Sequence, residues 1–179
     1  AIPDGVTNIG DGTFHGCSGL TSVNIPDGVP KIGDFTFCEC RGLTSVTIPD
    51  SVTNIGDWAF HGCSGLTSVT IPNGVSRIGH GAFQQCSGLT SMTTPGQGAE
   101  IASRAFSRCD GLVVVTLPPL DDMTLSAGAF RQCRLLSFVI APPHMHTSIG
   151  DCFDGCPLLT GLEADTAKNR RRVLRLRYW

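Results

Sequence analysis

Large apolar residues return along the chain at a fixed interval. Phenylalanines stand 23 residues apart, with one interval of 24, and each is followed three residues later by a cysteine and six residues later by a leucine. The phenylalanines of this column are Phe14, Phe37, Phe60, Phe83, Phe106, Phe130 and Phe153. A sequence period of roughly 20 to 50 residues is typical of proteins built from repeated units that stack on one another.

Each unit contains a short segment in which polar and apolar side chains alternate, which predicts a β-strand. In the third full copy, Ser68 and Thr70 should point to solvent. Val69 and Ile71 should point into a core. So short a strand can neither satisfy its backbone hydrogen bonds nor cover its apolar side alone. We therefore expect one strand per unit, paired in parallel with its neighbours about 4.8 Å apart, over stacked columns of apolar side chains.

Prolines and glycines mark the ends of the predicted strands and the corners. Proline has no N–H to donate, so Pro26, Pro49, Pro72, Pro95 and Pro118 should end the strand ladder. A glycine follows the last isoleucine of the unit and suits a tight corner; these glycines are Gly10, Gly33, Gly56 and Gly79.

The unit reads A-F-x-x-C-x-x-L-x-x-V-x-I-P-x-x-V-x-x-I-G, and it resembles the leucine-rich repeats of the BspA-like class. The resemblance covers residues 1–162. It implies an α/β fold: a right-handed curved solenoid of about seven coils, with short helical or 3₁₀ turns on the face away from the strands. It also implies a non-enzymatic protein of adhesion or recognition at the cell surface or in secreted form. The first four units are the most regular, since Thr94 and Gly98 depart from the pattern in the fifth.

Composition and charge add limits to this interpretation. With 41% hydrophobic and 16% charged residues the chain can form a folded core. It has no apolar run long enough for a membrane span, and its first residues, AIPDGV, carry no targeting signal. Because it begins within a repeat and without Met, we expect a mature or truncated fragment.

Nine cysteines suggest a disulfide framework, but seven of them form one column of the repeat. Equivalent Cβ atoms in stacked coils should lie about 4.8 Å apart and point the same way, whereas a disulfide needs them about 3.8 Å apart and turned toward each other. We therefore interpret the column as buried free thiols that act as small apolar groups. Cys152 falls in an alanine column and is interpreted in the same way.

The position after the repeated phenylalanine carries His15, Cys38 and His61 in consecutive units, a set that could hold a soft divalent metal. A zinc site needs a fourth ligand and closer convergence, so we expect an ordinary surface column and no cofactor. The sequence has no nucleophile elbow, P-loop, zinc-protease helix motif or paired C-x-x-C motif, and an enzyme is not expected.

The outward strand positions change from hydroxyl-bearing to apolar side chains along the chain. The resemblance implies that the strand face engages ligands, so we expect a protein or glycoconjugate to bind at Ser68, Thr70, Ser91, Thr93, Val114, Thr116, Phe138 and Ile140. Two alternatives stay open. The chain could be a purely structural or adhesive module without a dedicated ligand, or its hydroxyl array could order water as ice-binding solenoids do.

Phe35 and Trp58 form a second candidate patch, because they share a repeat position in adjacent units. Other units carry Gly12, Gly81, Arg104 and Gly128 there. Stacked at an outward corner, the two aromatic side chains would form an exposed apolar patch typical of an interface hot spot. They could instead fold back over their own turns.

Two acidic columns precede a basic end of the chain. The columns Asp4, Asp27, Asp50 and Asp11, Asp34, Asp57 should be exposed and keep the surface soluble, with calcium binding as the alternative. Residues 163–179 carry six cations and two anions. We expect this basic tail to cap the last coil with a short helix that begins at Thr166 and packs Val173, Leu174 and Leu176 on it. Contact with phosphate or an anionic surface is a second possibility, and a disordered end or a non-native sequence is a third. Otherwise no nucleic-acid partner is expected.

Overall fold

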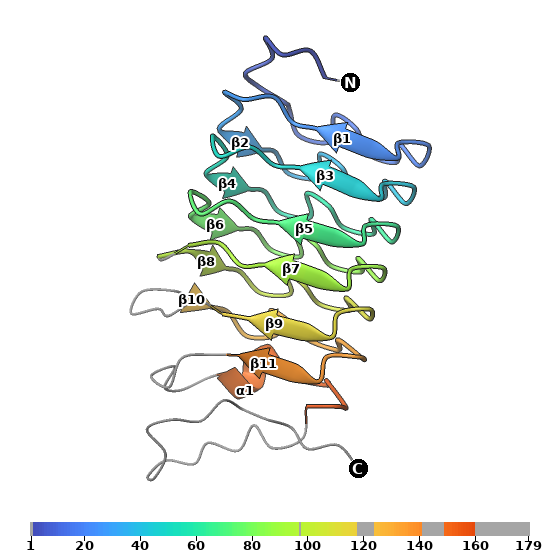
Figure 1. Cartoon of the computed structure of the whole chain (residues 1–179), viewed down its shortest axis with the longest axis vertical. Coiled ribbons are helices and arrows are strands. Elements are labelled where there is room, and N and C mark those ends of the chain that lie inside the picture. Colours follow the sequence, from blue (N-terminus) through green and yellow to red (C-terminus); the bar gives the residue numbers. More distant parts are fainter. Residues whose placement is uncertain (1, 97, 118–123, 141–148, 160–179) are drawn as a thin grey trace.

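The chain is a stack of coils, each formed by one sequence repeat (Figure 1). A computed structural model describes residues 2–96, 98–117, 124–140 and 149–159. Parallel pairing joins β1 (Ser22–Asn24) to β3 (Ser45–Thr47), β5 (Ser68–Thr70) to β7 (Ser91–Thr93), and β9 (Val114–Thr116) to β11 (Phe138–Ile140). These strands follow one another down one face of the stack, so the strand positions predicted from the alternating pattern are confirmed.

Five of the described coils also contribute a second, shorter strand that the sequence pattern did not predict. These strands are β2 (Lys31–Ile32), β4 (Asn54–Ile55), β6 (Arg77–Ile78), β8 (Glu100–Ile101) and β10 (Thr124–Leu125), and they form one five-stranded parallel sheet. The expectation of one strand per repeat is therefore wrong. Two residues with a single isoleucine or leucine are too short to show an alternating pattern.

The helical turns expected on the other face are also not found. In the described part of the chain the only helix is α1 (Ile149–Cys152), with four residues, and the phenylalanines lie in hydrogen-bonded turns. Left-handed residues such as Phe35 (φ 55°) and Glu39 (φ 60°) recur in these turns, and a right-handed helix cannot continue through them. The fold is thus a parallel β-solenoid, and the α/β description is not confirmed. Its handedness and curvature stay predictions.

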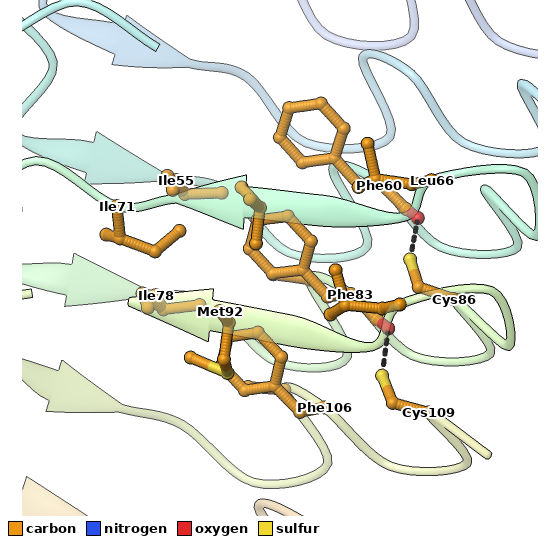
Figure 2. Close-up of a cluster of buried hydrophobic side chains, with 14 of the residues drawn as sticks. Ile55, Phe60, Leu66, Ile71, Ile78, Phe83, Cys86, Met92, Phe106 and Cys109 are labelled. Carbon is orange, nitrogen blue, oxygen red and sulfur yellow. Dashed lines mark hydrogen bonds between the residues drawn. The ribbon is translucent and has the colours of Figure 1, made fainter. Parts of the chain in front are cut away.

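The repeated phenylalanines form a column of stacked rings through the core. From Phe14 to Phe153, neighbouring rings are stacked with their centroids 5.0 to 5.2 Å apart. Figure 2 shows three of them, Phe60, Phe83 and Phe106, one below the other beside the buried leucine and isoleucine columns. Sequence units 23 residues apart are therefore neighbours in space, as expected.

The cysteines are free thiols, as predicted, and all except the exposed Cys17 are buried. They are more than apolar filler, because each thiol of the column from Cys40 onward donates to a phenylalanine carbonyl of the preceding coil. Figure 2 shows two such bonds, from Cys86 Sγ to Phe60 O and from Cys109 Sγ to Phe83 O, each 3.2 Å long. Burial raises the pKa of both thiols well above the ordinary value.

One of the two acidic columns connects the coils. Asp11 Oδ1 accepts the backbone N–H of Asp34 at 2.8 Å, and the same bond recurs from Asp57 to Asp34 and from His80 to Asp57. These aspartates stabilise the stack through fixed hydrogen bonds, a role that the prediction of an exposed, solubilising column did not include. Asp11 is exposed, whereas Asp34 and Asp57 are half-buried. The bond also explains the glycines that follow the isoleucines. A Cβ on Gly79 would lie 2.5 Å from Asp57 Oδ1. Glycine is therefore required because the aspartate side chain lies so close to the backbone, and not because the backbone there is left-handed.

Several predictions fall on residues that the structure does not describe. They concern Pro118 and the cap in residues 163–179, including Thr166, Val173, Leu174 and Leu176. The boundary between the solenoid at 1–162 and this tail stays a prediction. Across the described ranges, no helix combines the length and the apolar character that crossing a bilayer demands.

Candidate recognition surfaces

The eight side chains predicted for ligand binding lie together on the outward face of four strands. Ser68 is paired with Ser91, and Thr70 with Thr93, on β5 and β7. On β9 and β11, which follow them down the stack, Val114 is paired with Phe138 and Thr116 with Ile140. All are exposed except Val114 and Phe138, which are half-buried. The alternate residues of the same strands, Val69, Met92, Val115 and Val139, are buried and supply the core.

This strand face changes chemistry between β7 and β9. On β5 and β7 it presents hydroxyl groups, of which Thr93 Oγ1 accepts the N–H of Ile71 at 3.0 Å and so also ties two coils together. On β9 and β11 it becomes apolar, and Ile140 is 44% exposed. An exposed aliphatic group beside hydroxyls is a composition suited to protein contacts, because hydroxyls can hydrogen-bond at the rim while the apolar part loses water.

Val113, directly before β9, is a further exposed apolar residue that was not predicted. At its position, Thr44, Thr67 and Thr90 donate their side-chain hydroxyls to a carbonyl of the preceding coil at 3.0 to 3.4 Å. Valine has no hydroxyl, so Val113 cannot make this bond, and its side chain is 41% exposed. The signal was present in the sequence as a break in a threonine column, but the column's structural role becomes visible only in the folded stack.

Phe35 and Trp58 are stacked on each other at a corner of the coils, as the second candidate patch requires. Their rings are 5.1 Å apart with an interplanar angle of 13°, and Trp58 packs edge-on against His80 at 4.8 Å. Both residues have left-handed backbones, with φ of 55° and 52°. A residue with a Cβ in this conformation costs about 1–2 kcal/mol, and a stacked pair contributes about 0.5–1.5 kcal/mol beyond its buried area. The stack alone therefore does not offset the backbone cost of two such residues.

A second left-handed position of the repeat lines a polar groove that the sequence did not predict. Glycine occupies this position in some coils, but Glu39, Gln85, Arg108 and Gln132 occupy it in others. Their side chains line a groove of about 780 Å³. Much of its hydrogen-bonding capacity is used within the protein: Arg41 Nη2 lies 2.8 Å from Glu39 Oε2, and Arg108 Nε donates to Gln132 Oε1 at 2.9 Å.

The column of His15, Cys38 and His61 does not form a metal-binding cluster. His15 is exposed, Cys38 is buried, and His61 lies with its Nε2 3.6 Å from Glu39 Oε1. Burial lowers the pKa of His61, and the carboxylate of Glu39 opposes that change. Within residues 2–96, 98–117, 124–140 and 149–159, no three or more His, Cys, Asp and Glu side chains are arranged to hold a metal ion.

Comparison with known proteins supports the repeat assignment. The family model of the BspA-type leucine-rich repeat region matches six copies, over residues 1–113 and 57–168. A leucine-rich repeat protein of T. pallidum is similar in structure, with a TM-score of 0.68 and 32% identity over 73% of this chain and 61% of that one. None of the curated proteins compared matches the chain.

Two further solved structures share the fold. A leucine-rich cell surface protein of Faecalibacterium prausnitzii has a TM-score of 0.54 and 30% identity, over 74% of this chain and 44% of that one. A leucine-rich repeat protein of Bacteroides ovatus has a TM-score of 0.52 and 24% identity, over 89% of this chain and 52% of that one, and at this identity it supports the fold alone. The chain thus spans about half the length of these relatives.

Proposed function

This chain belongs to the family of BspA-type leucine-rich repeat proteins, and from that premise we propose that it is a recognition module that binds a protein ligand through its strand face. Leucine-rich repeat proteins generally bind other proteins. The similar protein of Faecalibacterium prausnitzii is a cell surface protein, which supports placing this module at a cell surface or in secreted form. The proposal assigns no reaction to the chain.

The observation that supports this proposal best is the apolar end of the strand face. Phe138 and Ile140 stand in register with Val114 and Thr116, and the fold does not need them for its core, because Val115 and Val139 fill the interior. Here an exposed isoleucine lies next to a half-buried phenylalanine, and the neighbouring strands present hydroxyl groups. In interfaces of this kind a few central apolar residues carry most of the binding energy.

The thiols in the middle of the cysteine column are unsuited to nucleophilic chemistry. A reactive cysteine needs a lowered pKa and access to solvent. Cys63, Cys86 and Cys109 are fully buried, and burial raises the pKa of each. In the folded chain these groups therefore stay protonated and act in packing and hydrogen bonding.

The test compares two pairs of substitutions. Phe138→Ala with Ile140→Ala removes the apolar end of the strand face, and Phe35→Gly with Trp58→Gly removes the corner patch as a matched control. The wild-type chain is immobilised, surface proteins captured from host or neighbouring cells are identified, and their affinities for each variant are measured by surface plasmon resonance. We expect the strand-face pair to weaken binding by at least roughly tenfold and the corner pair to leave it unchanged.

Two results would contradict the proposal. If the captured protein binds the strand-face pair as tightly as the wild type, recognition lies elsewhere. If no protein is captured with a measurable affinity, the chain is better described as a structural repeat module. Circular dichroism of every variant checks that the coils are intact in both comparisons.

A further inference from the structure

An edge of aromatic and charged side chains follows one corner of the coils and is distinct from the strand face. Phe35 stacks on Trp58, and Trp58 packs against His80. His80 Nδ1 lies 2.7 Å from Ser103 Oγ of the next coil. His80 and Ser103 in turn line a groove of about 590 Å³ together with Arg104, Arg131, Asp151 and Asp154. The aromatic stack and the groove are therefore one continuous surface.

The aromatic end of this surface is built on backbone positions that favour glycine. Gly12, Gly81 and Gly128 hold the equivalent left-handed position in other coils, which shows that the fold needs no side chain there. A Cβ added to Gly12 would meet nothing within 4 Å, so the coil before Phe35 leaves open space at this corner. Phe35 is itself 41% exposed. A bulky aromatic residue in an unfavourable conformation, with one side open, fits a contact role better than a packing role.

The polar end of the surface is balanced in charge. Arg104 and Arg131 face two aspartates, and Arg131 Nε lies 3.2 Å from Asp154 Oδ2. A phosphate or a polyanion would gain little from such a groove, because its two carboxylates offset the attraction of the guanidinium groups. A neutral hydroxyl group, by contrast, can accept a hydrogen bond from a guanidinium group and donate one to a carboxylate at the same time.

Together these features fit one class of ligand. The C–H face of a sugar ring is apolar and packs on an aromatic ring, while its hydroxyls need donors and acceptors in the same place. The surface runs from the coil of Phe35 to the coil of Asp154, five coil spacings of about 4.8 Å, or about 24 Å, which is the length of several linked sugar rings. We propose that this corner binds a neutral oligosaccharide, with one sugar ring against the exposed Phe35, whose ring stacks on the half-buried Trp58, and hydroxyl groups in the groove of Arg104, Arg131, Asp151 and Asp154.

The experiment uses defined neutral hexasaccharides: cellohexaose, xylohexaose, mannohexaose and chitohexaose. Binding to the whole chain is measured by isothermal titration calorimetry and by the change in tryptophan fluorescence. At least one hexasaccharide should bind with a dissociation constant in the millimolar range or tighter. Phe35→Gly and Trp58→Gly should each weaken that binding roughly tenfold or more. Both variants introduce the residue that other coils carry at this position, so they should keep the circular dichroism spectrum of the wild type.

The control is the strand-face pair Phe138→Ala and Ile140→Ala, which should bind the hexasaccharide as the wild type does. This control separates the sugar site from the proposed protein site, because each pair of substitutions should affect one ligand alone. The inference is overturned if none of the hexasaccharides binds, or if binding survives in both glycine variants. It is also overturned if the corner variants lose a protein ligand while no sugar binds, since the corner would then be a protein interface.

Discussion

Removal of one ring from the middle of the phenylalanine column should cost more stability than removal of a ring at its end. Phe83 is fully buried and stacks on Phe60 at 5.0 Å and on Phe106 at 5.1 Å. Phe14 is half-buried and stacks on Phe37 alone, at 5.2 Å. Truncation of a buried phenylalanine to alanine costs about 3–5 kcal/mol, and each stacked pair contributes about 0.5–1.5 kcal/mol. We therefore expect about 4–5 kcal/mol for Phe83→Ala and about 2 kcal/mol for Phe14→Ala.

Urea unfolding followed by circular dichroism measures both free energies, and double substitutions test how the effect spreads. Phe60 and Phe83 are in contact, so the pair should show an interaction free energy of about 0.5 kcal/mol or more. Phe37 and Phe106 are three coils apart, so their costs should add within about 0.5 kcal/mol. Equal losses from Phe83→Ala and Phe14→Ala, or a strong interaction between Phe37 and Phe106, would refute the reasoning, since a column of nearest neighbours allows neither.

The other predictions concern the contacts between coils. Gly88→Ala would place a Cβ 2.5 Å from a carbonyl oxygen of the preceding coil and should clearly lower the urea midpoint of unfolding. Gly19→Ala is the control, because its Cβ would meet nothing within 4 Å and should leave the midpoint unchanged. Equal midpoints for the two variants would contradict the close approach of the coils. Asp34→Ala leaves the backbone N–H of Asp57 without its acceptor and should cost about 1–3 kcal/mol, while Asp34→Asn keeps an acceptor oxygen and should cost less. Burial raises the pKa of the Cys40 thiol from 9.0 to about 11. The thiol therefore ionises in the unfolded chain at a lower pH than in the folded chain, and the free energy of unfolding should fall as the pH rises from 9 to 11. A constant urea midpoint over that range would contradict this prediction.

The columns of the core could be predicted from the sequence because each depends on one repeated residue type. The spacing of Phe60 and Phe83 alone was enough to place them in adjacent coils, where their rings indeed stack. The alternating pattern gave the strands that contain Val69 and Val115. Features made of two residues or of backbone contacts left no such pattern. The short strand Asn54–Ile55 and the thiol-to-carbonyl bond of Cys86 belong to this group.

The candidate surfaces were predictable only in part. Phe35 and Trp58 could be placed on one corner from their shared repeat position, and they do stack there. Their left-handed backbone, and the continuation through His80 into a charged groove, depend on turn geometry and on contacts between coils. The hydrogen bond to Asp34 could not be predicted, because a repeated aspartate looks the same in the sequence whether or not it accepts a backbone N–H.

The most direct test of the stacked arrangement is a set of distances between spin labels on equivalent outward positions. Cysteines introduced at Asn24, Thr116 and Ile140, in a chain with the exposed Cys17 replaced by serine, carry the labels, and double electron–electron resonance gives the distances. Four coil spacings separate Asn24 from Thr116 and five separate it from Ile140, so the distances should be about 19 Å and about 24 Å before the label linkers are added. A distance that does not increase with the number of coils between the labels would contradict the account.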